Sequence, residues 1–216
     1  MAFARFRLTA EDRKAISEAI AKAEATTSGE IVFAITDASG KYRHSWFQLA
    51  LAGMALSAAA YLMVPVSHSI SALLWTEILS FAALFTAGPH LGFRRWFVAS
   101  SEMETRVRNA AFMEFYSSGL YRTRDENGVL IYLSLFERRV VVLGDKGIHE
   151  RMGERHWNDV RDLIIRGIKS GDARGGICAA VERCGNSLAE HFPRKADDVN
   201  ELSDHVIDRT AKPQDG

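Results

Sequence analysis

The pattern of hydrophobic and polar positions changes character twice along the chain. Up to about residue 43 and after about residue 98, apolar residues recur among charged ones, whereas charges almost vanish in between. Near the start, Ile16 and Ile20 lie on one face of a helix for which Thr9 is a plausible N-cap. The next segment, Ile31–Ile35, has the composition of a buried strand. This stretch therefore predicts an amphipathic helix followed by a strand.

The second amphipathic part begins with a helix expected from about Glu102 to Ser118. "VLIYLSLF" (129–136) is a continuous apolar run suited to a central strand, and "RVVVLG" (139–144) follows a tight turn as its antiparallel neighbour. Two more helical patterns complete the segment. Strands and helices in this order predict an α/β domain with a mixed β-sheet flanked by helices.

The intervening stretch contains two long apolar segments. "WFQLALAGMALSAAAYLMVP" (46–65) has no charged residue, and "ISALLWTEILSFAALFTAGPHL" (70–91) has only Glu77. Each would span about 30 Å as a helix, which is the thickness of the hydrocarbon core of a bilayer. A core helix of a soluble domain keeps a polar stripe, which the first segment lacks. The sequence therefore predicts an inserted two-helix transmembrane hairpin.

The flanking charges predict the orientation of this hairpin. Lys41 and Arg43 precede the first segment, Arg94 and Arg95 follow the second, and the connecting loop has no Lys or Arg. Positive residues stay on the cytoplasmic side. We therefore expect a two-pass protein of the bacterial inner membrane with both termini in the cytoplasm. Glu77 is expected to face the partner helix or a second subunit in protonated form.

These patterns define three parts of the chain. A discontinuous α/β domain is expected over residues 1–43 and 98–193, with the transmembrane hairpin at residues 44–97. Residues 194–216 form a polar C-terminal tail. Small residues on one face of the first hairpin segment leave room for helix–helix association and for a homo-oligomer.

Charge and cysteine content exclude some classes of function. The 27 Lys and Arg residues balance the 27 Asp and Glu residues, so no basic field indicates a nucleic-acid partner. The two cysteines, Cys178 and Cys184, are six residues apart on an expected helix and make a poor disulfide pair. The expected partners are the lipid bilayer and other membrane proteins.

Several motifs resemble those of a known family. "GVLIYLSLFERRVVVLGDKGIHERMG", "SGEIVFAIT" and "IKSGDARGGICAAVERCGNSLAEHFP" resemble the central strands, the first strand and the final loop and helix of the TPM domain, the thylakoid-lumen-phosphatase-like family. The resemblance covers residues 9–43 and 98–193 and is greatest to the bacterial branch with a membrane hairpin. It implies a TPM-like mixed sheet with helices on both faces. Some relatives are described as acid phosphatases, others as calcium-binding proteins or as non-enzymatic helpers of membrane complexes.

Candidate chemistry is confined to the ends of the strands. The chain has no Cys-x5-Arg loop, no Asp-x-Asp pair and no P-loop, so any ligands come from separate loops. The candidate metal ligands are Glu30, Asp145, His149 and Glu154. The family often has an acidic residue at Glu154, whereas its usual Glu is replaced here by His149. A histidine suits a softer metal or proton transfer.

Each candidate also has a purely structural interpretation. Asp145 is a turn former, Glu154 is a first-turn charge favoured by the helix dipole, and Glu30 is a partner for a cation. His149 and His156 are seven residues apart around a helix start and are treated as independent of each other.

Three classes of function remain open. The first, which we favour, is a membrane-anchored, non-enzymatic cytoplasmic binding module that assists or maintains membrane protein complexes. The second is a metal-dependent acid phosphatase-like enzyme that uses carboxylates around Asp145. The third is a domain that binds calcium or another divalent metal, which would then be its cofactor.

Overall fold

The chain forms two compact units, residues 1–39 with 104–216 and residues 40–103. We call the first the α/β unit and the second the hairpin unit, and each is described by itself. In this computed structural model, the described residues are 6–64, 69–87, 94–151, 154–195, 201–202 and 205–210.

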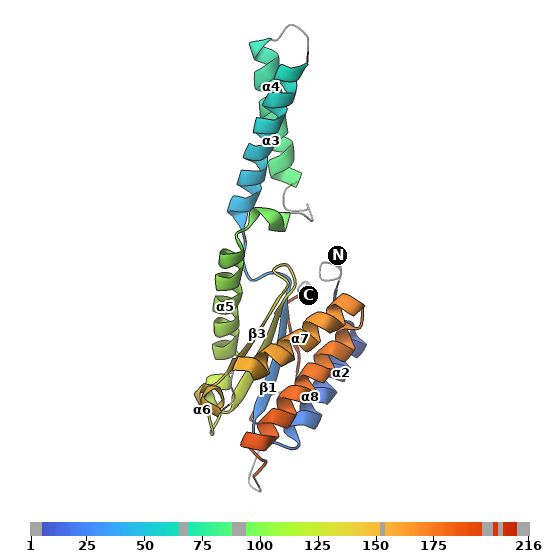
Figure 1. Ribbon diagram of the computed structural model, residues 1–216, viewed down its shortest axis with the longest axis vertical. Coiled ribbons are helices and arrows are strands. Elements are labelled where there is room, and N and C mark those ends of the chain that lie inside the picture. The colour runs from blue at the N-terminus through green and yellow to red at the C-terminus, as the bar shows by residue number, and fades with distance from the viewer. Residues whose placement is uncertain are drawn as a thin grey trace, which may run out of the picture. The chain divides into compact units, whose positions relative to one another are not determined.

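A four-stranded mixed sheet forms the centre of the α/β unit (Figure 1). The strands are β1 (Glu30–Thr36), β2 (Gly128–Ser134), β3 (Arg139–Gly144) and β4 (Ile207–Asp208), in the order β3-β2-β1-β4. β1 runs parallel to β2 and β4, and β2 is antiparallel to β3. The predicted α/β class, the mixed sheet and the antiparallel pairing of its last two predicted strands are confirmed.

Three helices cover one face of this sheet. They are α2 (Ala10–Glu24), α7 (Glu154–Ser170) and α8 (Ala173–His191), which lie together on the same side in Figure 1. The short helix α6 (Lys146–Arg151) connects β3 with α7. Apolar side chains of these helices and of alternate strand positions form the larger core, which includes Ile16, Ile20, Ile31, Phe33, Ile35, Ile131, Ile164 and Ile168. Burial of this apolar area is the main stabilising contribution.

The other face of the sheet is covered by α5 (Ser100–Ser117) and the short helix η3 (Leu120–Arg122). The remaining alternate positions of β1 and β2 pack here against the inner side of α5, as expected for strands buried on both faces. The buried residues of this second core are Val32, Ala34, Val107, Ala111, Phe115, Leu120, Leu130 and Tyr132.

Local sequence explains where the first helix begins and how two helices approach each other. Thr9 is the N-cap of α2, and its hydroxyl accepts a hydrogen bond from the backbone of Asp12, whose carboxylate accepts in return from the Thr9 backbone. α7 and α8 approach at Gly167 and Gly176, where an added Cβ on Gly176 would lie 2.8 Å from the Cα of Gly167. Only glycine allows these two backbones to come so close.

The polar C-terminal tail contributes a strand that its composition did not indicate. Ile207 and Asp208 pair with Ala34 and Ile35 on the free side of β1. Asp208 also accepts a hydrogen bond of 2.9 Å from Arg13 of α2. The tail is therefore part of the fold of the α/β unit.

The hairpin unit contains α3 (Arg43–Met63) and α4 (Ile70–Ala87), followed by the short helix η2 (Arg94–Phe97). Segments of 20 and 18 residues within α3 and α4 are long and apolar enough to cross a membrane, and only 11% and 0% of the respective segments are buried.

The Glu77 carboxylate lies against the partner helix of the hairpin, one of the two placements expected from the sequence. It accepts a hydrogen bond of 2.7 Å from the hydroxyl of Ser57 on α3.

Candidate functional site

Two of the predicted ligands lie at the same edge of the sheet. Glu30 is the first residue of β1, and Asp145 directly follows β3, which runs in the opposite direction. Gly128, at the start of β2, pairs with Glu30, and its carbonyl accepts a hydrogen bond of 2.9 Å from the Asp145 backbone. Glu30 and Asp145 thus flank Gly128 at what we call the amino edge, where β1 and β2 begin.

The two carboxylates are separated by the width of a strand on either side of Gly128. Two strand spacings correspond to about 9–10 Å, whereas oxygen ligands of one calcium ion lie within about 2.6 Å of it. Leu120 packs over Gly128, since a Cβ there would lie 2.7 Å from the Leu120 side chain. The structure therefore places Glu30 and Asp145 in one row, with Gly128 and the Leu120 side chain between them.

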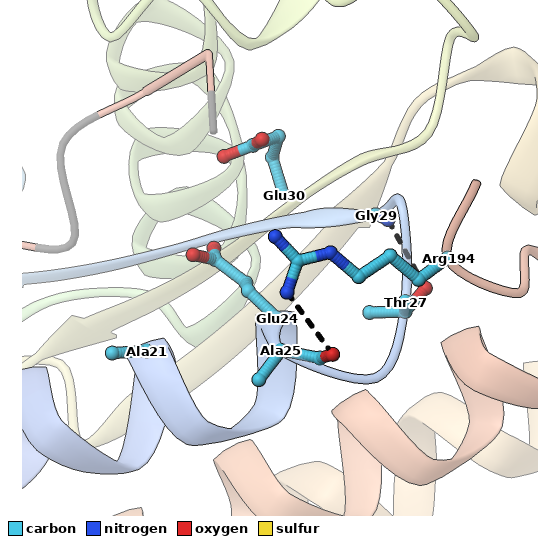
Figure 2. Close-up of a pocket in the computed structure, with 7 residues that line it drawn as sticks. All are labelled: Ala21, Glu24, Ala25, Thr27, Gly29, Glu30 and Arg194. Atoms are coloured by element: carbon cyan, nitrogen blue, oxygen red, sulfur yellow. Dashed lines mark hydrogen bonds between the residues drawn. The ribbon is translucent and has the colours of Figure 1, made fainter. Parts of the chain in front are cut away.

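A small pocket of about 90 Å³ lies at the same edge. Glu24 of α2, Glu30 of β1 and Arg194, which follows α8, line it together with Thr27 and small residues (Figure 2). Glu30 is only 6% exposed, and one of its oxygens accepts a hydrogen bond of 3.1 Å from the backbone of Glu201. The pocket combines two carboxylates and a guanidinium, a polar set that suits an ordered water.

The carboxylates of Glu24 and Glu30 in this pocket make different contacts. Glu24 accepts a hydrogen bond of 2.7 Å from the backbone of Ile31 and so ties the end of α2 to the start of β1. In Figure 2, the Glu30 side chain lies on one side of the ribbon of β1 and the Glu24 side chain, from the end of α2, lies on the other, while the Arg194 guanidinium extends towards Glu24. Arg194 also donates a hydrogen bond of 3.2 Å to the carbonyl of Ala25.

The remaining predicted ligands cannot be placed as side chains. His149 belongs to α6 and Glu154 begins α7, but both side chains, like that of His156, lie outside the described residues. Within the described part of the chain, no three His, Cys, Asp or Glu side chains gather closely enough to hold a metal ion. The metal site made of Glu30, Asp145, His149 and Glu154 stays a prediction.

A buried polar network occupies the opposite, carboxyl edge of the sheet. Glu137, in the turn between β2 and β3, is fully buried and accepts hydrogen bonds from the backbone of Ser39 (2.9 Å) and the hydroxyl of Ser134. The Ser39 hydroxyl donates to that of Ser134 at 2.9 Å and lies 3.2 Å from the Tyr132 hydroxyl. Burial raises the pKa of the Tyr132 phenol, although its hydrogen bond with Ser39 acts in the opposite direction. The network fixes the point where the chain leaves the α/β unit, after Ser39.

The thiols are poor nucleophiles. Cys184 is buried in the larger core, and burial raises its pKa to about 12. Burial also raises the pKa of Cys178. A reactive cysteine needs a lowered pKa and access to solvent, so neither residue has the required environment.

Sequence reasoning missed Glu24, Arg194 and Glu137 as parts of these two edges. The sequence places Glu137 in the tight turn before residues 139–144, but its hydrogen-bond partner Ser39 lies 98 positions earlier. The one available signal was a carboxylate between two apolar strands, a position where burial demands hydrogen-bond partners.

Comparison with known proteins agrees with this architecture. Residues 96–187 match the family model of the TPM domain. The NMR structure of the BA42 protein from the psychrophilic bacterium Bizionia argentinensis is similar, with a TM-score of 0.58 and 24% sequence identity over 96% of this chain and 99% of that one. Among curated proteins, no sequence matches the chain.

The sheet order and the covering helices define an α/β domain, and residues 96–187 of the chain resemble the TPM domain. This match confirms the resemblance to the TPM domain that was found in the motifs of that part of the chain. At 24% identity the likeness to BA42 shows the fold alone.

Proposed function

We propose that this chain is a membrane-tethered binding module, in which the hairpin unit anchors the TPM domain to the bacterial inner membrane and the domain assists other membrane proteins. The exposure of the two apolar helices carries the proposal. Their apolar segments are 11% and 0% buried, so most of their side chains face the surrounding medium. Exposed apolar area on this scale is stable in lipid and unfavourable in water.

The charges beside the hairpin support cytoplasmic termini. Lys41 and Arg43 stand before α3, and Arg94 and Arg95 stand after α4. Their positive charge favours the cytoplasmic side of the membrane, with the loop between α3 and α4 on the periplasmic side. Trp96 is 85% exposed beside these cations, a placement that suits the interface between lipid and water.

Single cysteines test both the anchoring and the orientation. In a Cys178→Ala background, Ser69→Cys reports on the loop side of the hairpin and Ser101→Cys on the domain side. We expect a membrane-impermeant maleimide to label intact cells of the first variant, and to label the second only after permeabilisation. Extraction of the protein into alkaline carbonate as a soluble species, or the reverse labelling pattern, would contradict the proposal.

A tagged pulldown in mild detergent tests the binding role. The full-length protein should recover at least one membrane protein in near-stoichiometric amount, and an unrelated two-pass protein with the same tag should not. Recovery of nothing specific would leave a tethered domain without a binding function.

The amino edge supports a second candidate, a site for a divalent cation. The observation in its favour is the buried carboxylate of Glu30, which lines the small pocket at this edge. Calorimetric titration of the full chain with calcium, magnesium and zinc should show binding that Glu30→Gln weakens at least tenfold. Glu18→Gln, an exposed change on α2, is the matched control. Phosphate release from p-nitrophenyl phosphate is worth assaying only if one of these ions binds.

A further inference from the structure

A continuous strip of exposed apolar and cationic side chains follows the outer side of α5 and continues into η3. It consists of Arg108, Phe112, Met113, Tyr116, Tyr121 and Arg122, and we call it the α5 strip. Met113 and Tyr116 are 71% and 60% exposed, and Phe112 and Tyr121 are 40% and 42% exposed. The inner side of the same helix is buried against the sheet, so the strip is not needed for the core.

The groups of the strip hold one another in place. The guanidinium of Arg108 lies 5.7 Å from the centre of the Phe112 ring, and that of Arg122 lies 5.1 Å from the centre of the Tyr121 ring. The Tyr116 and Tyr121 rings are 5.3 Å apart, and Arg122 donates a hydrogen bond of 2.7 Å to the Tyr121 hydroxyl. Side chains ordered in this way lose less entropy when a partner binds.

The composition of the strip is that of the centre of a protein interface. Tyr, Phe, Met and Arg are enriched in such centres, and aromatic and Arg residues supply most hot spots. Four large apolar side chains exposed side by side also exceed the isolated apolar groups that are normal on a surface.

The charges around the strip indicate the chemistry of its partner. Acidic neighbours are engaged by cations from other parts of the α/β unit: Glu104 by Arg139 at 3.5 Å, and Glu114 by Arg209 at 3.1 Å. Asp125, just after η3, likewise pairs with Lys195 at 2.6 Å. Arg108 and Arg122, in contrast, stand over aromatic rings at the two ends of the strip. The surface therefore presents apolar area between two positive charges.

We propose that the α5 strip binds an acidic amphipathic helix of a partner membrane protein. Apolar side chains of that helix pack on Phe112, Met113 and Tyr116, and its carboxylates pair with Arg108 and Arg122. The helical part of the strip rises about 12 Å from Arg108 to Tyr116, so two to three turns of the partner suffice. This inference rests on the proposed function, because it identifies where the module binds and what it recognises.

The test uses two designed 18-residue peptides and the full chain in detergent micelles. Both peptides are amphipathic helices with one Leu/Phe stripe, flanked by Glu in the first and by Lys in the second. Fluorescence anisotropy should show at least tenfold tighter binding of the Glu peptide, which weakens as salt is added. Arg108→Glu combined with Arg122→Glu should abolish that preference and create binding of the Lys peptide. Arg161→Glu combined with Arg166→Glu, two exposed changes on α7, is the matched control and should leave binding unchanged.

A photo-crosslinking residue at position 113 then locates the natural contact in native membranes. Crosslinks to a protein segment that is acidic and amphipathic, lost in the double charge reversal, support the proposal. Equal binding of both peptides, or crosslinks only to lipid or to a second copy of the chain, overturn it. If the charge-reversed variant still recovers the partner found with the wild type, the α5 strip is not the binding surface, but the proposed function as a tethered binding module is unaffected. If the wild type recovers no partner, the proposed function fails. The peptide-binding measurements then test by themselves whether the α5 strip prefers an acidic amphipathic helix.

Discussion

The α/β unit and the hairpin unit use the same apolar residue types in opposite ways. Ile131 and Ile164 of the α/β unit are fully buried, whereas Ile70 and Ile78 of the hairpin are 79% and 55% exposed. In the first unit, apolar groups leave water by packing on one another. In the second, most of the surface of the two apolar segments is left for the environment to cover. An apolar helix therefore shows whether it is surrounded by protein or by another medium only when its packing partners in the fold are known.

Polar groups show the same contrast. Glu137 of the α/β unit is held by a backbone amide and a hydroxyl in a network of several residues. Glu77 of the hairpin accepts from Ser57 on the partner helix. The buried carboxylate of the α/β unit is thus part of a network, whereas the carboxylate of the hairpin joins the two helices of that unit.

The largest expected difference between the units comes from a matched pair of truncations. Ile131→Ala should reduce the free energy of unfolding of the α/β unit by about 2–5 kcal/mol, because it leaves a cavity in the larger core. Ile78→Ala should change it by less than about 0.5 kcal/mol, since the side chain is exposed. Urea denaturation of the full chain in detergent, followed by hydrogen exchange of β2, measures both. Equal losses would show that the units unfold together.

Glycines at helix contacts give the next largest contrast. A Cβ on Gly176 would meet the backbone of Gly167 at 2.8 Å, whereas a Cβ on Gly53 would meet the end of the Leu84 side chain. The first obstacle is rigid and the second can turn away, so Gly176→Ala should destabilise by about 1–3 kcal/mol and Gly53→Ala by much less. Thermal unfolding followed by circular dichroism compares the two. A tolerated Gly176→Ala would mean that α7 and α8 can move apart.

Asp208 gives the α/β unit a dependence on pH. Burial alone would raise the pKa of its carboxyl, but hydrogen bonds from Thr210 and Arg13 outweigh this and lower it. A group with a lowered pKa in the folded state stabilises fully above its unfolded pKa of about 3.9, and this contribution is lost as the pH falls through the folded value. Asp208→Asn should therefore reduce the free energy of unfolding by about 1–2 kcal/mol at pH 7 and by less below pH ~4.

Unfolding curves at several pH values test this dependence, with the exposed change Asp159→Asn as control. A difference between Asp208→Asn and wild type that is the same at pH 3 and pH 7 would exclude the carboxylate as its source.

The smallest expected effect belongs to the polar contact inside the hairpin. A double-mutant cycle of Ser57→Ala and Glu77→Gln should give a coupling energy of about 0.6 kcal/mol if the hairpin lies in a membrane as proposed, because this is the usual size for hydrogen bonds between membrane helices. Pulse proteolysis in micelles of the four proteins measures it. A coupling energy indistinguishable from zero would mean that Ser57 and Glu77 contribute independently to the hairpin.

Much of the fold could be predicted because its elements have strong local patterns. β1 and β2 are continuous apolar runs, and the Thr9 cap of α2 is fixed within four residues of sequence. β4 has no such pattern, since two residues in a polar tail carry no periodicity and their partner strand lies far earlier in the chain.

The candidate site was predicted less well, because the positions of side chains depend on contacts between distant segments. Glu30 and Asp145 were correctly expected at strand ends, but their separation across Gly128 follows from the strand order, which sequence alone leaves open. The α5 strip was missed for a related reason. A helical pattern shows which face is buried, but it does not show whether another element covers the opposite face.

The insertion of the hairpin between two neighbouring strands has a consequence for biogenesis. β1 is complete at Thr36, but its neighbours β2 and β4 begin only at Gly128 and Ile207, after both hairpin helices have been made. During translation, both hairpin helices leave the ribosome while β1 still lacks both pairing partners. The sheet is complete only after residues 207 and 208 have been made. A ribosome that stalls before residue 207 would leave β1 with an open strand edge, which is a target for quality-control proteases.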